Sequence, residues 1–444
     1  MMNIATLKDK NIFRRIRDRF FIHFPSFKYR NFRLFFFGQV ISVIGTWMQS
    51  TAQSWLVLQI TNSPFKLGLL SAVQFLPALF LSLYAGVIID KFSKKKILIF
   101  TQSSLAILAF VLGLLVTLKV VQYYQILIIA FLSGLVNTID MPARQSFYIE
   151  LVDKEHLMNA ISLNSSAFNL ARIIGPGIAG ILIGAVGYSL SFYLNAISFV
   201  PVIVAIFFVV ERTIRPGRFS LRDLEHVNKD AIEGLKYILK IPIILIIFAL
   251  FIVVNVFGLN FNVLVPTLVK QVFKLQSTDY GFLMSMMGVG ALTGSLFLAV
   301  ISYKGVKHFY LFGGALVLGL TLLLTGLFPN YYLTIALTTL SGFSMVLFLN
   351  TANTLLQMES SEEFRGRVMS IYSLIFLGFT PFGALLTGTL SEKISVQFTY
   401  SLVGMIVTIT TLIVYFLGYR RVFGREELHV RRVSGSYEGN FPKK

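Results

Sequence analysis

The 444-residue sequence contains no cysteine, and charged residues make up only 13% of it. The absence of cysteine excludes disulfides and thiolate metal sites, and the five histidines show no ligand spacing. A GxxxxGK(S/T) phosphate-binding loop is also absent, and no polar interval is long enough to form a nucleotide-binding domain. We therefore expect no metal, no cofactor and no enzyme activity, and an energy source other than ATP.

What the sequence does contain is apolar surface: 55% of its residues are hydrophobic, and its mean hydropathy is +0.75. Apolar runs of roughly 18 residues or more recur along the chain, and each is long enough to cross a bilayer core of about 30 Å as a helix. Lipid cannot satisfy backbone polar groups, so helices fit these runs. Continuous runs such as residues 243–254 lack the alternation of membrane strands. The sequence predicts an all-α membrane protein.

We expect twelve transmembrane helices in two pseudo-symmetric six-helix bundles, because short sequence matches recur in the same order in both halves. The bundles are residues 32–210 and 242–419, flanked by a basic N-terminal segment (1–31), a linker (211–241) and a basic tail (420–444). The expected helices are 32–60, 66–89, 96–119, 123–141, 160–187, 189–210, 242–269, 280–303, 309–328, 331–356, 368–391 and 396–419.

The lysines and arginines are distributed unevenly between the two sides of the membrane. Of the 39 in the chain, only five lie in odd-numbered loops: Lys66, Lys119, Lys270, Lys274 and Lys393. The positive-inside rule then places both termini in the cytoplasm, which requires an even number of helices. The formal charge of +19 thus reflects membrane topology, and nucleic acid is not an expected partner.

One charged residue, Arg172, falls near the middle of a predicted helix, whereas none of the 20 carboxylates does. Facing lipid it would cost at least ~3 kcal/mol, so we expect it to face protein or water. Ser162, Ser165 and Asn169 share its helix face. Two interpretations stay open: Arg172 contacts an anionic or carbonyl group of a substrate, or it is a structural residue bound to backbone carbonyls of a neighbouring helix.

Side-chain amides gather on the first, fourth, seventh and tenth predicted helices and are scarce on the third, sixth, ninth and twelfth. Amides are costly against lipid, so the first set of helices is expected to line a cavity and the second to face lipid. For any single amide, hydrogen bonding between helices is an equal alternative. The cavity candidates, with Arg172, are Gln49, Gln53, Asn137, Asn169, Asn255, Asn262, Asn350 and Asn353.

The loop between the second and third helices carries Gly86, Asp90 and Lys91, followed by Lys94 and Lys95. This pattern resembles the signature loop of the major facilitator superfamily. The resemblance implies that Asp90 makes charge and helix-terminus contacts that form a cytoplasmic gate between the halves.

A longer segment includes Asp140, Arg144 and Arg172, and the run Gly175–Pro176 followed by Gly180. It closely resembles the enterobactin-exporter and macrolide-efflux branch of that superfamily, also called the transmembrane secretion effector family. Gly175, Pro176 and Gly180 are similar to the fifth-helix motif of its antiporters, which implies a hinge. Asp140 and Arg144 are candidates for a proton or charge relay.

The expected function is therefore secondary active export of an amphiphilic organic molecule, such as a siderophore, a macrolide or another drug-like compound. We expect alternating access coupled to protons, in a monomer surrounded by lipids of the bacterial inner membrane. The alternatives are a lipid or lysolipid flippase or an importer on the same fold, and a membrane scaffold that transports nothing.

Overall fold

The computed structural model describes residues 22–209, 221–301, 305 and 307–419, and most of these residues lie in helices. Residues 90, 221–226 and 419 are described by their backbone alone. Two short 3-10 helices, η1 (Pro25–Lys28) and η2 (Lys154–His156), accompany six long helices in the first half. The long helices are α2 (Arg30–Thr61), α3 (Pro64–Lys91), α4 (Lys94–Thr117), α5 (Tyr123–Leu151), α6 (Leu157–Val186) and α7 (Ser189–Phe208).

The second half begins with α8 (Leu221–Lys240), which is strongly amphipathic, and contains more interrupted helices. Its seventh-helix region is built of α9 (Pro242–Val253), η3 (Val254–Gly258), α10 (Phe261–Thr267) and η4 (Leu268–Phe273). The remaining elements are α11 (Ser277–Ile301), α12 (His308–Leu327), α13 (Tyr331–Glu359), α14 (Glu362–Gly378), α15 (Thr380–Lys393), α16 (Val396–Ile413) and η6 (Val414–Tyr419).

Eleven helical segments within the described residues have the length and apolar composition needed to cross a membrane. The helix α2 is not one of them, although it has 32 residues. Gln49, Gln53 and neighbouring serines and threonines interrupt its apolar sequence and lower its hydropathy. The fold is therefore that of a helical membrane protein, and the amides expected on the first helix are among the polar residues that separate α2 from the other spans.

The observed helix boundaries differ most from the expected ones in three places. The helix α5 continues to Leu151 instead of ending at residue 141, because Asp140 and Arg144 pair with each other along the helix. The seventh span is broken by η3, and the eleventh is divided between α14 and α15 at Phe379. Since α5 is longer than expected, Asp140 lies inside a helix and is buried.

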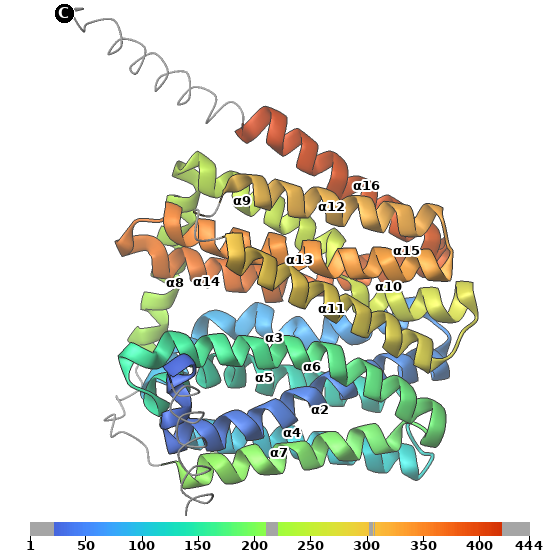
Figure 1. Cartoon of the computed structure of the whole chain (residues 1–444), viewed down its shortest axis with the longest axis horizontal. Coiled ribbons are helices and arrows are strands. Elements are labelled where there is room, and N and C mark those ends of the chain that lie inside the picture. The colour runs from blue at the N-terminus through green and yellow to red at the C-terminus, as the bar shows by residue number, and fades with distance from the viewer. Residues whose placement is uncertain (1–21, 210–220, 302–304, 306, 420–444) are drawn as a thin grey trace, which may run out of the picture.

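Each half is a bundle whose helices pack on one another, and the most extensive contacts between the halves come from two helix pairs (Figure 1). In the first half, α2 packs against α6 and α7, α3 against α5, and α4 against α5 and α7. In the second half, α11 and α12 pack against α13, and α12 packs against α16. The pairs α6–α11 and α3–α15 connect the halves, so the molecule has two layers with a shared central seam.

The helix α8 lies across one end of this seam, at the left in Figure 1, and we call this the α8 end and the opposite end the far end. The Tyr84 hydroxyl donates a 2.7 Å hydrogen bond from α3 to Asn228 of α8. On the other side, Arg367 of α14 pairs with Asp230 and Glu233 of α8. The helix α8 thus contacts both halves at this end.

At the far end the two halves are closed against each other. Every residue of α2 from 51 to 58 is buried, as is every residue from 263 to 269 in α10 and η4. Lys270 donates a 2.7 Å hydrogen bond to the Leu58 carbonyl at the end of α2. A carboxylate oxygen of Glu392 accepts hydrogen bonds from the Ser63 hydroxyl and, at 2.9 Å, from the Phe65 amide at the start of α3. Charges of the second half thus bind helix ends of the first.

The seam itself is formed by two backbone crossings built on glycine. A Cβ added at Gly281 of α11 would lie 2.9 Å from the Gly180 Cα of α6. A Cβ added at Gly388 of α15 would lie 3.1 Å from the Gly68 Cα of α3. Small residues allow helices in lipid to approach this closely. The two crossings occupy equivalent places in the two helix pairs, so the seam has internal symmetry.

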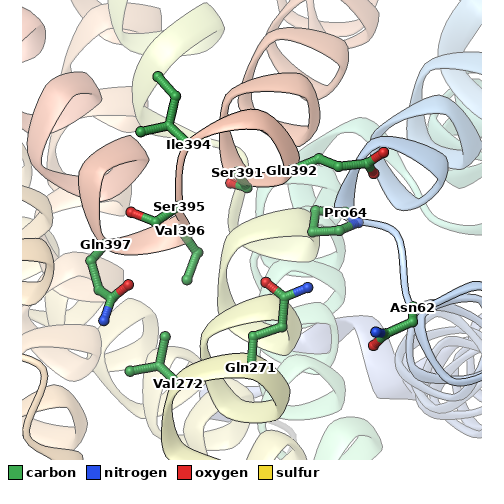
Figure 2. Close-up of a pocket in the computed structure, with 10 residues that line it drawn as sticks. All are labelled: Asn62, Pro64, Gln271, Val272, Ser391, Glu392, Ile394, Ser395, Val396 and Gln397. Atoms are coloured by element: carbon green, nitrogen blue, oxygen red, sulfur yellow. The ribbon is translucent and has the colours of Figure 1, made fainter.

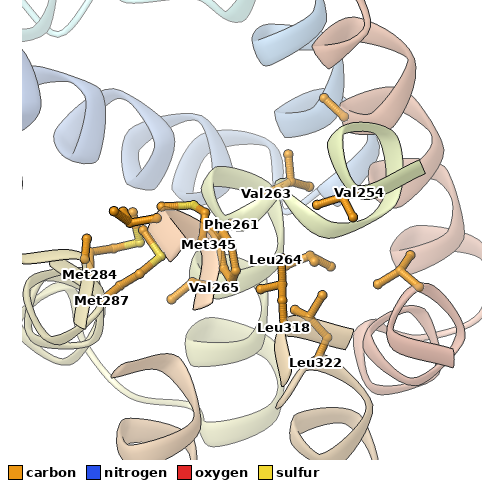
Figure 3. Close-up of a cluster of buried hydrophobic side chains, with 14 of the residues drawn as sticks. Val254, Phe261, Val263, Leu264, Val265, Met284, Met287, Leu318, Leu322 and Met345 are labelled. Carbon is orange, nitrogen blue, oxygen red and sulfur yellow. The ribbon is translucent and has the colours of Figure 1, made fainter. Parts of the chain in front are cut away.

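The core beside the seam is apolar and lies largely in the second half (Figure 3). Val263 and Leu264 of α10 belong to one buried cluster with Met284 and Met287 of α11 and Leu318 of α12. The far half of the seventh span therefore packs on all sides, which fixes it as part of the far-end closure.

We predict that Gly281→Val destabilises the protein. The added Cβ would lie 2.5 Å from the Pro176 carbonyl oxygen, and overpacking of this kind usually costs about 1–3 kcal/mol. Thermal unfolding of purified protein in detergent should show a lower midpoint. The matched control is Gly313→Ala, where an added Cβ has no neighbouring atom within 4 Å. Equal midpoints for the two variants would contradict the proposed role of the crossing.

Candidate functional site

Arg172 lies where α6 is flanked by both of its partner helices. On one side Gly175 packs against Ile44 and Trp47 of α2. On the other side Gly288 of α11 lies beside the Arg172 carbonyl, and the Ser285 hydroxyl donates a 2.6 Å hydrogen bond to the Ile173 carbonyl. The Arg172 side chain is partly buried between these two contacts.

Toward the α8 end, the same face of α6 is open. The serines on it, Ser162 and Ser165, are exposed, and Asn169 is partly buried. The close approaches between α6 and α11 run from Gly184 beside Thr278 to Arg172 beside Gly288. Arg172 therefore marks the α8-end limit of the closed seam, and a polar, accessible helix face begins there.

Three of the predicted cavity amides, Gln49, Asn255 and Asn137, form hydrogen bonds within their own halves. The Asn195 amide of α7 donates a 2.6 Å hydrogen bond to Gln49. Asn255 donates to the Phe376 carbonyl at 3.0 Å, and Asn137 donates to the Ser133 carbonyl at 2.8 Å. These contacts match the alternative in which an amide joins helices or its own backbone.

The other predicted cavity amides make fewer hydrogen bonds to neighbouring helices. Asn350 is exposed, and Asn353 accepts a 2.6 Å hydrogen bond from the exposed Gln357 in the same helix. Gln53 is buried, and its amide nitrogen has no acceptor among the described residues. Asn262 is partly buried. The structure does not gather all the predicted amides into one site, although Asn350 and Asn353 share the accessible part of α13.

The helices expected to face lipid do expose large apolar side chains, such as Phe100 and Ile107 of α4 and Ile197 of α7. Their amides, however, are not on the lipid side. Gln102 and Asn195 are buried and bind neighbouring helices, at Asp140 and Gln49 respectively.

Asp140 is the centre of a buried polar cluster between α4 and α5. Its carboxylate accepts hydrogen bonds from the Thr101 hydroxyl at 2.5 Å and from the Gln102 amide at 2.7 Å, and it forms an ion pair with Arg144. A buried carboxylate with three donors is a satisfied group. The geometry is that of a structural ion pair, and releasing it would require Arg144 to move.

The signature loop contributes contacts within the first half. Lys94 pairs with Glu150 at the end of α5 at 3.0 Å. Lys95 donates hydrogen bonds of 2.8 Å and 2.7 Å to the carbonyls of Phe207 and Val209, which end α7. A Cβ at Gly86 would meet no atom within 4 Å. The side chain of Asp90 lies outside the described residues, and the gate that it was expected to form stays a prediction.

The candidate hinge in α6 is packed on both sides. Pro176 lies inside the helix and is buried, and its carbonyl is beside Gly281. Gly180 forms the crossing with α11, and Ser277 donates a 3.2 Å hydrogen bond to its carbonyl. The small residues of this motif thus allow α6 and α11 to approach closely at the seam. A hinge motion at the motif stays a prediction.

A pocket of about 470 Å³ opens at the far end, between the start of α3, the end of η4 and the turn from α15 to α16 (Figure 2). Glu392 and Gln271 line it, together with Ser391, whose buried hydroxyl has no partner among the described residues. None of the predicted cavity residues lines this pocket. It lies at the opposite end of the seam from the exposed face of α6.

Several residues of the site were missed by the sequence interpretation. Trp47 and Phe168 contact the Arg172 guanidinium, and Glu392 and Lys270 bind helix ends across the seam. Phe168 precedes Arg172 by four residues, a spacing that places the two side chains together on a helix. No local pattern signals the other three, because their partners are distant in the sequence.

Two helical bundles joined by a narrow seam, closed at one end and accessible at the other, define a membrane transporter of the major facilitator type. Residues 23–430 match the family model described as transmembrane secretion effector, and the chain belongs to that family.

Characterised relatives extend over most of the chain. A staphyloferrin A transporter from Staphylococcus aureus is 27% identical over 402 residues, covering 89% of this chain and 98% of the relative. The multidrug efflux pump Tap from Mycolicibacterium fortuitum is 24% identical, covering 86% and 95% of the two chains. Macrolide efflux protein A from Streptococcus pyogenes is 23% identical with the same coverage.

Solved structures support the fold. The nucleoside transporter NupG superposes with a TM-score of 0.68 at 13% identity, covering 87% of this chain and 98% of that one. A bacterial homologue of the human lysosomal transporter Spinster, in an inward-facing and unoccupied conformation, gives a TM-score of 0.64 at 12% identity, covering 88% and 96%.

We predict that Arg144→Met is strongly destabilising, because it leaves the buried Asp140 carboxylate without its cation. Breaking a buried ion pair from one side typically costs about 3–5 kcal/mol. The double variant Asp140→Asn, Arg144→Met should recover much of the loss in thermal unfolding midpoint, because no uncompensated charge remains. A double variant no more stable than Arg144→Met alone would show that the pair is not the stabilising feature.

Proposed function

We propose that this protein is a secondary active transporter that exports an amphiphilic organic molecule across the bacterial inner membrane by alternating access. The observation that carries the proposal is the asymmetry of the seam. It is closed by glycine crossings and charged helix-end contacts at the far end, and the polar face of α6 is accessible toward the α8 end. This is the arrangement expected of one state of a rocking-bundle transporter.

The topology follows from the charges. The loops at the α8 end carry most of the lysine and arginine, so this end is assigned to the cytoplasm, together with both termini. In this assignment α2 also crosses the membrane, which brings the number of spans to twelve, because it packs against α6 and α7 within the first bundle. The two moving bodies are proposed to be residues 32–210 and 242–419, and the exposed face of α6 at the α8 end favours a state open to the cytoplasm.

The direction and class of substrate rest on the relatives. Their names describe a siderophore transporter, a multidrug efflux pump and a macrolide efflux protein. Two of these names specify efflux, and they support the proposal that this chain exports a siderophore, a macrolide or another drug-like compound. A monomer in lipid suffices, because both helix pairs of the seam belong to one chain.

The energy source is proposed to be the proton gradient, with Asp140 and Arg144 as the candidate relay. Asp140 is the one carboxylate placed in the interior of a spanning helix among the described residues. Its pairing with Arg144 would have to open during each cycle for it to carry a proton. Proton coupling is therefore the part of the proposal most directly open to test.

Transport can be measured in everted membrane vesicles loaded with an acidic interior. We expect uptake of radiolabelled staphyloferrin A that depends on the protein and stops when nigericin collapses the pH gradient. Uptake that persists after collapse would remove proton coupling while leaving export intact. Movement in the opposite direction alone would exclude an exporter.

We further predict that Glu392→Gln favours opening of the far end. The neutral amide makes weaker hydrogen bonds to the start of α3, and a loss of about 1 kcal/mol would change the equilibrium about fivefold. The chain has no cysteine, so Ser54→Cys, at a buried position behind the closure, can be labelled selectively with an impermeant maleimide. Labelling of intact cells should be about fivefold faster in the Glu392→Gln background.

Glu363→Gln removes the same charge from the α8 end and is the matched control. Lys119→Cys should be labelled from outside in every background, whereas Lys154→Cys should be protected, which tests the topology in the same experiment. Equal labelling of Ser54→Cys in all backgrounds would show that Glu392 does not hold the closure.

A further inference from the structure

Arg172 faces the space between the bundles. The helix α2 packs against the side of α6 that carries Gly175, and α11 packs against the side that carries Ile173. Ile181, nine residues from Arg172 and therefore about 180° around the helix, is 64% exposed on the outer surface. The guanidinium is thus directed away from the lipid side, between two helices of opposite halves.

The cation is held by aromatic rings. Its Cζ lies 5.2 Å from the ring centroid of Trp47 and 5.6 Å from that of Phe168. The two rings are themselves in edge contact at 5.7 Å with an interplanar angle of 73°. Ring faces stabilise a guanidinium and fix its plane without neutralising its charge.

The guanidinium has no anionic partner in the part of the chain that the structure describes. No acceptor there lies within hydrogen-bond distance of its buried Nε, and no carboxylate forms an ion pair with it. The backbone carbonyls that a structural arginine would bind are not bound. The helices α2 and α6 contain no acidic residue. The one acidic residue of α11, Asp279, lies in the first turn of that helix, at the far end of the molecule.

We propose that Arg172, with Trp47 and Phe168, is the binding element for a carboxylate on the transported molecule. This inference rests on the proposed transport function and narrows its substrate to amphiphilic organic acids. A guanidinium presents a planar fork that matches two carboxylate oxygens, and the exposed end of the seam gives access from the α8 side. The indole of Trp47 supplies an apolar surface for the body of the same molecule.

The chain provides its own optical probe for this site. It has two tryptophans, Trp47 and Trp55, and Trp55 is buried against Tyr280 at the far end. In a Trp55→Phe background, Trp47 is the single tryptophan and reports contact at Arg172. Energy transfer to a dansyl group can then compare dansyl-glycine, a carboxylate, with dansyl-glycinamide, its neutral match.

We expect the Trp55→Phe protein in detergent to bind dansyl-glycine at least about tenfold more tightly than the amide, a ratio of about 1.4 kcal/mol. Arg172→Gln should reduce this preference to about twofold or less. Arg172→Lys should keep part of the preference, because lysine retains the positive charge but lacks the planar guanidinium that can bind both carboxylate oxygens. Lys154→Gln, which removes a cation from η2, should leave the preference unchanged. The thermal midpoint of each variant identifies any that do not fold.

Equal binding of the two probes, or a carboxylate preference that survives in Arg172→Gln, would overturn the proposal, as would the absence of energy transfer with either probe. Phosphatidylglycerol that displaces dansyl-glycine at lower concentration than unlabelled N-acylglycine would assign the site to lipid phosphate instead. Carboxylate binding without any transport in vesicles would contradict the exporter and leave the site standing.

Discussion

Close approach of helix backbones at the seam is the constraint on which the rest of the structure depends. In lipid there is no hydrophobic force to hold two helical bundles together, so their association relies on packing and hydrogen bonds. Gly180 with Gly281 and Gly68 with Gly388 bring the backbones into contact at one end. Any motion that keeps the helices intact must therefore separate the bundles by releasing these crossings or by pivoting on them.

The position of Arg172 follows from the same crossings. The α6–α11 contact ends at Arg172 and Gly288, and the polar face of α6 is accessible beyond that point. An arginine at the centre of a bilayer costs about 3 kcal/mol or more, and each aromatic ring that contacts it returns about 0.5–2 kcal/mol. Trp47 and Phe168 together with accessible water can thus support the cation where a carboxylate partner is lacking.

Sequence reasoning performed best where the physics is local. Apolar runs located most of the spans to within a few residues, since a helix that crosses lipid needs about 20 apolar residues. The run alone did not locate the break at Val254–Gly258 or the division at Phe379. Pro381 marks the division at Phe379 in the sequence. The break at Val254–Gly258 lies in a largely apolar run, where packing against other helices decides the path of the backbone.

The end of α5 shows the same limit for polar residues. The helix was expected to end at residue 141, whereas the pairing of Asp140 with Arg144, and its hydrogen bonds from Thr101 and Gln102 of α4, accommodate these polar groups in a longer helix. Likewise the Gln49–Asn195 bond joins residues that are far apart in the chain. The face that Arg172 occupies was predictable from helical periodicity, but its ring contact with Trp47 and the absence of an anion beside it were not.

The sign of the charge at Arg172 also bears on how export is driven. A bacterial membrane is negative inside, so each negative charge that leaves the cell gains about 2.3 kcal/mol per 100 mV. An exporter of organic anions would therefore receive part of its driving force from the membrane potential directly. Proton exchange would then add to this force, and the cycle would not require a free carboxylate in the membrane interior. Asp140, whose carboxylate is occupied by three donors, is compatible with a structural role in such a cycle.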